Sequence, residues 1–171
     1  LPAAVRQDLP ALSEALHALA RVRSAHPAQD GSVRLLVDLC DGQTVESVML
    51  PRDGVCVSTQ VGCAVGCRFC MTGQNGLLRQ LGSAEIVAQV VLARRQRAVR
   101  KVVFMGMGEP LANYNRLMQA IRVLIEPQPN GLGMSARNIT VSTVGLAPAM
   151  QKLAGEGLPL TLALSLHAPD D

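Results

Sequence analysis

The sequence predicts an α/β fold built on a parallel sheet, and two observations lead to this expectation. From about residue 55 onward, short apolar segments of strand length alternate with longer segments whose apolar residues recur at helical spacing, and the strand-length segments are themselves nearly continuous in apolar residues. Such alternation is typical of βαβ units, whose strands are buried on both faces and therefore read as nearly continuous apolar runs. Roughly four such strands are expected, fewer than a closed (β/α) barrel requires. We therefore predict a partial barrel.

A small accessory region of one helix and one β-hairpin is expected to precede the barrel. In the segment 10–23, Leu and Ala residues recur at helical spacing, which predicts an amphipathic helix. The segments 33–39 and 44–50 are strand-like, and Asp41-Gly42 between them is a hairpin turn signal. We expect this accessory region to span residues 1–54.

Residues 55–171 are expected to form the first part of the barrel. Strands are predicted over 55–58, 101–105, 138–142 and 160–165, and helices over 83–97, 113–125 and 146–154. In parallel sheets of this kind, ligands bind at the carboxyl ends of the strands. The loops that follow the predicted strands are therefore the places to look for chemistry.

Composition sets limits on the class of protein. The chain has 171 residues, of which 49% are hydrophobic, enough for a sizeable core and against disorder. No apolar run approaches the roughly 20 residues of a membrane span, so we expect no membrane association. The net charge of +3 is compatible with an RNA partner without requiring one. The aromatic content of 2% is low for a single-strand binder that relies on base stacking.

The first predicted barrel strand is followed by three cysteines with the spacing C-x3-C-x2-C. They are Cys63, Cys67 and Cys70, and small residues such as Gly62 and Gly66 lie around them. Three thiolates can hold three irons of a [4Fe–4S] cluster and leave the fourth iron open to a small molecule. Glycines let a loop of this kind reach unusual backbone angles and direct amides toward sulfides.

The cysteines have two other possible interpretations. A disulfide framework calls for an even number of cysteines in an exported chain, whereas this chain has five and no recognisable signal peptide. We expect reduced cysteines and a cytoplasmic location. Structural zinc is the stronger alternative, because Cys40, Cys56 or His167 would be available as a fourth ligand.

Polar residues follow each of the next predicted strands as well. The loop 106–110 reads Gly-Met-Gly-Glu-Pro, Ser142 ends the third strand, and the segment 165–167 ends the fourth. The glycines permit close approach to a ligand, and Glu109 offers a carboxylate to an ammonium group. Taken singly, each feature also has an ordinary structural interpretation as a turn, a hydroxyl bonded to nearby backbone, or a solvated histidine. Their convergence on one sheet edge favours a ligand site.

The cysteine spacing followed by Gly-Met-Gly-Glu-Pro resembles the radical S-adenosylmethionine (SAM) superfamily. Longer strings are similar to the RlmN/Cfr family of RNA adenine methyltransferases: Cys56-Val-Ser-Thr-Gln-Val-Gly-Cys63, Val103-Phe-Met-Gly-Met-Gly-Glu-Pro-Leu111, Val141-Ser-Thr-Val-Gly145 and Leu164-Ser-Leu-His-Ala-Pro169. Val45-Glu46-Ser-Val48 matches as well. The resemblance extends from about residue 45 to residue 171.

This resemblance implies a fold, an activity and partners. The expected fold is the first part of a radical SAM (β/α) barrel. The family methylates carbon 2 of an adenine in 23S rRNA, or carbon 8 in the Cfr branch, and some members modify an adenosine beside the tRNA anticodon. Its cofactors are a [4Fe–4S] cluster and SAM, which an electron donor activates. The motifs favour the carbon-2 branch, and a monomer is expected.

The resemblance also implies roles for individual residues. The cluster would be bound by Cys63, Cys67 and Cys70, and SAM would chelate the open iron. Phe69 would pack near the adenine of SAM, Gly108 and Glu109 would contact its amino-acid part, and the site would be completed by Ser142, Ser165, Leu166 and His167.

In the family, reductive cleavage of SAM yields a 5′-deoxyadenosyl radical that abstracts hydrogen from a methylated cysteine near the C-terminus. The matching positions here are Glu46, as proton acceptor, and Cys56, which would resolve the RNA adduct through a transient disulfide. Without the family, Cys56 reads as a small buried residue and Glu46 as a solvent-facing carboxylate. No cysteine follows Cys70, so we expect that these residues alone do not complete methyl transfer.

Two further hypotheses stay open from the sequence alone. One is a radical SAM enzyme that acts on a different substrate, which would not need the C-terminal cysteine. The other is a non-catalytic zinc or RNA-binding module, which would hold zinc in place of iron and sulfide. The basic run 94–101 is either an RNA-facing patch or, more commonly, the solvated end of a helix.

Overall fold

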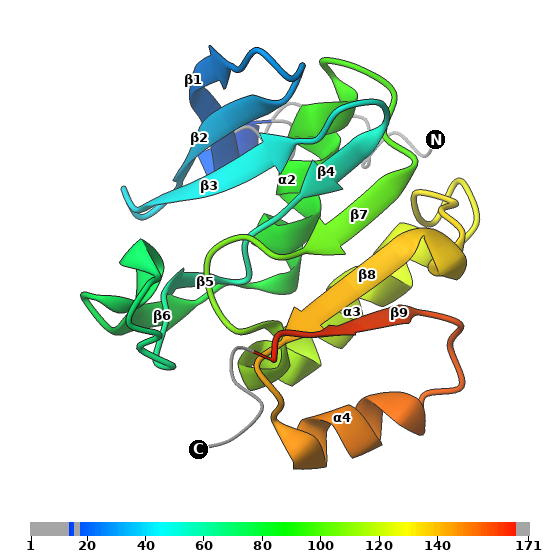
Figure 1. The fold of residues 1–171 in the computed structure, drawn as a ribbon. Coiled ribbons are helices and arrows are strands. Elements are labelled where there is room, and N and C mark those ends of the chain that lie inside the picture. Colours follow the sequence, from blue (N-terminus) through cyan, green and yellow to red (C-terminus); the bar gives the residue numbers. More distant parts are fainter. Residues whose placement is uncertain (1–13, 16–17, 167–171) are drawn as a thin grey trace.

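A computed structural model describes residues 14–15 and 18–166 of the chain. One seven-stranded sheet runs through the molecule in the order β1-β2-β3-β4-β7-β8-β9 (Figure 1). Its strands are β1 Ala20–Pro27, β2 Val33–Leu39, β3 Thr44–Met49, β4 Gly54–Cys56, β7 Lys101–Phe104, β8 Ile139–Thr143 and β9 Thr161–Leu164. A separate hairpin consists of β5 Gln60–Gly62 and β6 Leu77–Gln80.

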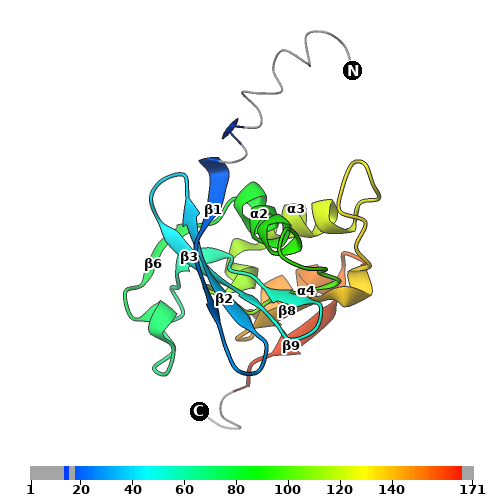
Figure 2. The same ribbon diagram turned by 90° about the horizontal axis from the view of Figure 1, so that it is seen from above.

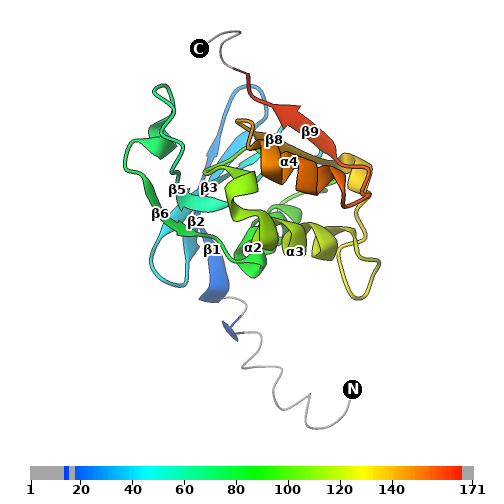
Figure 3. The same cartoon turned by 90° about the horizontal axis from the view of Figure 1, so that it is seen from below.

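Three α-helices connect or precede the later strands. They are α2 Ser83–Arg94, α3 Tyr114–Ile125 and α4 Ala147–Ala154, and three short 3-10 helices are η1 Met71–Gly73, η2 Pro110–Asn113 and η3 Ala136–Asn138. In Figures 2 and 3 the α-helices lie on the same side of the sheet. The predicted α/β class is confirmed, and the later strands are connected through helices as expected.

The sheet changes from antiparallel to parallel pairing at β4. Strands β1 to β4 pair antiparallel with their neighbours, whereas β4, β7, β8 and β9 pair in parallel. Val48 of β3 lies opposite Cys56 of β4, which in turn lies opposite Val103 of β7. The division proposed at residue 54 therefore lies where antiparallel pairing gives way to parallel pairing within one sheet.

The hydrophobic core lies between the sheet and the helices. Successive side chains of a strand point to opposite faces, and one set of alternate residues meets the helices. The fully buried contributors include Val55, Val57, Val102, Phe104, Ile139 and Val141 from the strands and Ile86, Val90, Leu117, Ile121 and Leu124 from the helices. The other set, which includes Glu46, Cys56, Val103, Thr140 and Ser142, lies on the opposite face of the sheet.

The helix predicted over residues 10–23 is wrong in its C-terminal part. Residues 10–13 and 16–17 lie outside the described residues, and residues 14–15 and 18–19 are helical. Strand β1 begins at Ala20, and Val22 pairs with Val37 of β2. Ala20-Arg21-Val22-Arg23 also alternates between apolar and polar residues, which suits a strand paired along β2. The segment 20–23 fits both helical and strand spacing, and pairing with β2 in the tertiary structure makes it a strand.

The hairpin that carries the cysteines was not predicted. Strands β5 and β6 are short, and β6 is mostly exposed, so neither has a recognisable apolar pattern. The predicted strands over 33–39, 44–50, 55–58, 101–105, 138–142 and 160–165 and the predicted helices over 83–97, 113–125 and 146–154 all correspond to observed elements, with ends that differ by at most three residues.

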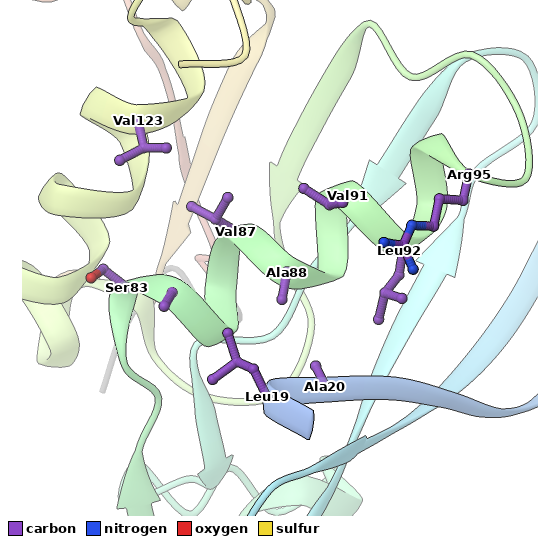
Figure 4. A pocket seen from close by; sticks show the side chains of 10 residues that line it. Leu19, Ala20, Ser83, Val87, Ala88, Val91, Leu92, Arg95 and Val123 are labelled. Carbon is purple, nitrogen blue, oxygen red and sulfur yellow. The ribbon is translucent and has the colours of Figure 1, made fainter. Parts of the chain in front are cut away.

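Helix α2 is apolar on two sides. Ile86 and Val90 face the core, whereas Val87 and Val91 line an apolar groove of about 420 Å³ on its outer side (Figure 4). Leu19, directly before β1, lines the same groove. Cysteines and carboxylates are absent from the lining within the described chain, so the groove is separate from the polar loops discussed below. Among the described residues, no helix has both the length and the apolar character needed to cross a membrane.

Helix α3 is joined to the loop after α4 through a polar cluster. The Tyr114 hydroxyl donates a hydrogen bond to Glu156 Oε1 at 2.8 Å, and Arg122 Nη2 lies 2.7 Å from Glu156 Oε2. Lys152 Nζ lies 4.2 Å from the centre of the Tyr114 ring. Desolvation and the hydrogen bond to Glu156 raise the pKa of Tyr114 to about 12.

We expect this raised pKa to be directly measurable, because the chain has a single tyrosine and no tryptophan. The absorbance of tyrosinate should titrate with a midpoint near 12 in the folded chain and near the ordinary value of 10.0 in denaturant. Because the folded state binds this proton more tightly, its contribution to stability is complete below the ordinary pKa and is lost as the pH rises through the folded value. A folded-state midpoint near the ordinary value would contradict the described contacts.

Candidate active site

A cavity of about 280 Å³ lies at the carboxyl ends of the parallel strands. Its volume is close to the lower end of the range for small-molecule sites, about 300–1,000 Å³. Four segments contribute to it, and its lining residues are Cys63, Val65, Cys67, Phe69, Cys70, Thr72, Phe104, Met105, Gly106, Gly108, Glu109, Pro110, Ser142, Val144 and Ser165. The loops that the sequence singled out therefore converge on one cavity.

The cysteines are carried by the loop that joins β5 to β6, at one side of the sheet (Figure 3). Gly62 has φ +77°, and a Cβ atom there would lie 2.1 Å from the Gly76 carbonyl oxygen, so only glycine fits. The Cys63 amide donates to that same oxygen at 3.0 Å, which closes the base of the loop. Between the first two cysteines, Gly66 has φ +67°. The backbone thus turns the cysteines toward the cavity.

All five cysteines of the chain are free thiols in the structure, and Cys63, Cys67 and Cys70 all line the cavity. Within residues 14–15 and 18–166, no three His, Cys, Asp or Glu side chains converge closely enough to hold a single metal ion. Zinc bound to cysteine requires sulfur atoms about 2.3 Å from one ion, and the described side chains do not preform such a site. A [4Fe–4S] cluster distributes its thiolates over separate irons. Cys63, Cys67 and Cys70 lie around one cavity, as thiolates bound to separate irons would.

Glu109 is buried at the cavity and bonded on both oxygens. Its Oε1 accepts a hydrogen bond from the Leu111 amide at 3.0 Å, and its Oε2 accepts one from the Val144 amide at 3.0 Å. The first bond caps η2, and the second ties the loop after β7 to the end of β8. Each carboxylate oxygen has a further lone pair, so the group can still receive an ammonium group from the cavity side.

The two glycines before Glu109 are required by close packing against the segment 57–60. A Cβ atom on Gly106 would lie 2.7 Å from both Ser58 Oγ and the Val57 carbonyl oxygen. Gly108 has φ +98°, and its Cβ atom would lie 2.5 Å from Gln60 Cβ. These positions accept only glycine because the segment 57–60 occupies the space.

The later strands contribute two serines to the cavity. Ser142 Oγ and Ser165 Oγ are 3.3 Å apart, and the Ser165 amide donates to the Thr143 carbonyl oxygen at 2.9 Å. Phe69 also lines the cavity and is 69% exposed. Leu166 is 74% exposed and is not part of the lining. The predicted site residue His167 lies outside the described residues.

Glu46 and Cys56 lie outside the cavity lining, on neighbouring strands β3 and β4. Strand alternation puts both on the sheet face opposite the helices. The Glu46 amide donates to Met107 Sδ at 3.4 Å, and the Glu46 carboxylate pairs with Arg34 at 3.2 Å. Glu46 is therefore adjacent to the loop 106–110 through its backbone.

Cys56 is buried, and this burial raises the pKa of its thiol above the ordinary value. A hydrogen bond from the Met105 backbone opposes the shift only in part. The thiol is therefore neutral near pH 7, which makes it a poor nucleophile unless its environment changes.

The basic run 94–101 does not form one uniform patch. Arg94 donates to the Leu132 carbonyl oxygen at 3.2 Å, and Arg97 donates to the Leu50 carbonyl oxygen. Arg100 lies 3.9 Å from Asp53. Arg94 and Arg97 thus support loops of the fold.

Sequence reasoning missed the residues that hold the cavity loops together. Ser58 Oγ donates to the Glu46 carbonyl oxygen at 2.6 Å and accepts from the Met107 amide at 2.8 Å. Gln60 Oε1 accepts from the Glu109 amide at 2.7 Å. The available signal was that Ser58 and Gln60 are polar residues in a segment expected to be buried. Buried polar side chains need hydrogen-bond partners, so these two residues could have been expected to connect neighbouring segments.

Comparison with known proteins gives a family match and several relatives. Residues 57–171 match the family described as the Radical SAM superfamily. A "Probable RNA methyltransferase" of Stutzerimonas stutzeri is 61% identical over 170 residues, which cover 99% of this chain and 48% of that protein. A protein of Methylibium petroleiphilum with the same description is 62% identical over 167 residues, which cover 98% of this chain and 46% of that protein.

A solved structure is similar over the whole chain. The crystal structure of a radical SAM methyltransferase from Sphaerobacter thermophilus matches with a TM-score of 0.85 and 42% sequence identity. The match covers 100% of this chain and 52% of that chain. The chain therefore spans about half the length of the relatives that it matches.

We expect the burial of Cys56 to protect it from alkylation. Near neutral pH, iodoacetamide should modify the exposed Cys40 roughly tenfold or more faster than Cys56, because both access and thiolate formation are reduced at Cys56. The Cys56 rate should rise with pH, and the two rates should converge in denaturant. Peptide mass spectrometry with fragment spectra assigns each site. Equal rates in the folded chain would contradict the raised pKa.

Proposed function

The chain belongs to the radical SAM superfamily, and from this membership we propose that it is part of an RNA methyltransferase that acts on carbon 2 of an adenine. The observation that carries the proposal is the single cavity on which three cysteines, a buried glutamate and two serines converge. Support for RNA as the substrate comes from the two relatives described as probable RNA methyltransferases.

Members of this superfamily use a [4Fe–4S] cluster and SAM, and the residues around the cavity fit both groups. When bound, they supply radical chemistry that can act on an unactivated carbon–hydrogen bond. Cys63, Cys67 and Cys70 would hold the cluster, with one iron left open.

The remaining cavity residues would bind and orient SAM. Glu109 would receive its ammonium group, and Gly108 would let the backbone approach closely. Ser142 and Ser165 would supply hydroxyl groups from the ends of β8 and β9, and Leu166 and His167 would extend this segment. Phe69 would cover the adenine ring of SAM and exclude water.

Glu46 and Cys56 would act on the RNA side of the reaction. Glu46 would accept a proton from the modified adenine, and its half-exposed carboxylate beside Arg34 is accessible to a large substrate. The Cys56 thiolate would attack the sulfur of an RNA-linked cysteine outside this chain, so that an S–S bond forms while the S–C bond to the RNA breaks and its electron pair stays on the carbon, which takes a proton to become the methyl group. Because the Cys56 thiol is neutral at rest, it would need a change in environment to react.

For the complete protein, we propose 23S rRNA as the main substrate and a tRNA adenosine as a second one. Adenine C2 is electron-poor and offers no nucleophile for polar methyl transfer, which is the chemical reason for a radical route. The proposal includes an electron donor that reduces the cluster, a monomeric enzyme and a cytoplasmic location.

Reconstitution of the chain with iron and sulfide under anaerobic conditions tests the cluster site. We expect about four irons per chain and a reduced [4Fe–4S] signal in electron paramagnetic resonance that changes when SAM is added, since one iron is open. Cys63→Ser should abolish the change on SAM addition, whereas Cys40→Ser should leave it intact, because Cys40 is exposed and outside the cavity. Stoichiometric zinc without sulfide would reject the proposal.

Nucleoside mass spectrometry tests the reaction itself. We expect the complete gene product, supplied with SAM and a reductant, to convert adenosine of 23S rRNA to 2-methyladenosine. Cys56→Ala should trap the protein on the RNA, because the thiol that releases the adduct is missing. Appearance of 8-methyladenosine would shift the proposal to carbon 8, and unmodified RNA with an active cluster would point to a different substrate.

A further inference from the structure

Gln60 and Gln80 lie on the two strands of the cysteine hairpin and contact the turn that contains Glu109. We propose that this pair positions Glu109 relative to the three cysteines, so that the two halves of the cofactor site keep one fixed geometry. The proposal rests on the proposed function. It assigns a role to two side chains that do not line the cavity themselves.

The two amides form a relay of hydrogen bonds. Gln60 Oε1 accepts from the Glu109 amide at 2.7 Å, and Gln60 Nε2 donates to Gln80 Oε1 at 2.9 Å. Gln80 Nε2 then donates to the Ala112 carbonyl oxygen at 3.2 Å. The relay therefore binds the turn at two points, the Glu109 amide and the Ala112 carbonyl oxygen.

The positions of these residues in the hairpin explain why the relay matters. Gln60 begins β5, three residues before Cys63, and Gln80 ends β6. The three cysteines lie between them in sequence. A displacement of either strand would move the relay, and with it the backbone that carries Glu109.

The relay continues beyond Glu109 to the third loop of the cavity. Glu109 Oε2 accepts from the Val144 amide, which follows β8. The path from Gln80 through Gln60 and Glu109 to Val144 joins three of the segments that line the cavity. Gln60 is fully buried and packs against Gly108, so its amide has little freedom to turn.

An amide is suited to this role because it both donates and accepts. In Gln60→Glu, a protonated carboxyl group would reproduce both bonds, since its O–H can donate to Gln80 Oε1. An ionised carboxylate would instead face Gln80 Oε1 with a second acceptor. If Gln80 turned its amide to donate to that carboxylate, its own bond to Ala112 would be lost. An ionised carboxylate at position 60 therefore costs the relay either the bond to Gln80 or the bond from Gln80 to Ala112.

Burial raises the pKa of a carboxyl group at position 60, so the variant becomes a pH-dependent version of the wild-type relay. The charged groups bonded to this network are Glu109, whose carboxylate is held by Leu111 and Val144, and Arg79, which donates to the Gln80 carbonyl oxygen. Arg79 is paired with Glu85 and Asp41, and a guanidinium keeps its charge throughout the pH range tested.

The test compares Gln60→Glu with Gln119→Glu, the same change on the exposed side of α3. SAM affinity of each reconstituted chain is measured from the change in its electron paramagnetic resonance spectrum, between about pH 6 and about pH 9. We expect Gln60→Glu to match the wild type at low pH and to weaken by about tenfold for each pH unit above its raised pKa. Gln119→Glu should follow the wild type throughout.

A second readout needs no cofactor. Hydrogen–deuterium exchange of the segment 106–112, taken as a ratio to the wild type at each pH, should increase in Gln60→Glu as the pH rises. In Gln60→Leu it should be raised at every pH, because both bonds are missing. Gln80→Leu should raise exchange of the Glu109 amide less than Gln60→Leu does, since Gln60 keeps its bond to that amide.

The outcomes separate this inference from the proposed function. If the wild-type spectrum does not respond to SAM, the proposed function fails, and hydrogen exchange still decides the role of the relay. If the wild type responds and Gln60→Glu shows neither a pH-dependent loss of affinity nor faster exchange, the positioning role is overturned. A variant that does not load the cluster is judged by hydrogen exchange alone, where protection equal to the wild type overturns the proposal.

Discussion

The contact between the segment 57–60 and the loop 106–109 is the constraint on which the rest of the site depends. The Gly106 amide donates to the Val57 carbonyl oxygen at 3.1 Å, and the Thr59 amide donates to the Met107 carbonyl oxygen at 2.9 Å. No Cβ atom fits at Gly106 or Gly108 without displacing this segment. Because the segment leads directly into the cysteine hairpin, the first two cavity loops are fixed to each other before any ligand binds. Preorganisation of this kind reduces the entropy lost on binding.

Buried polar side chains connect this contact to the other layers of the fold. The Ser58 hydroxyl bridges Met107 and the backbone of Glu46, and its own backbone bonds on both sides to Gln89 of α2. Gln89 is fully buried and also accepts a hydrogen bond from Ser47. A buried polar group that loses its partner costs about 1–3 kcal/mol, so each member of this network restrains its neighbours. Ser58 therefore connects helix α2, strand β3 and the loop that contains Glu109 through hydrogen bonds.

The sequence was sufficient for the parallel strands and their loops, because buried strands and amphipathic helices have distinct apolar patterns. It identified Cys63, Glu109, Ser142 and Ser165 as neighbours from the rule that parallel strands end at one edge, and all of them line the cavity. It failed at β1, where helical and strand periodicities overlap, and at β5 and β6, which are too short for a pattern. The relay through Gln60 could not be predicted, since a polar side chain in a strand shows its partner only when tertiary pairing is known.

The arrangement separates two kinds of chemistry in space. Residues that would hold the cofactors lie at the sheet edge, in loops locked by backbone hydrogen bonds and close-packed glycines. Glu46 and Cys56 lie outside the cavity lining on strands β3 and β4, where Glu46 is half-exposed and Cys56 is a buried neutral thiol. A rigid edge suits a radical generator, because misplacement by about 1 Å is costly in catalysis. A protected thiol suits the role proposed for Cys56, which is to react only with a positioned partner, since a thiolate exposed at rest would be open to oxidation.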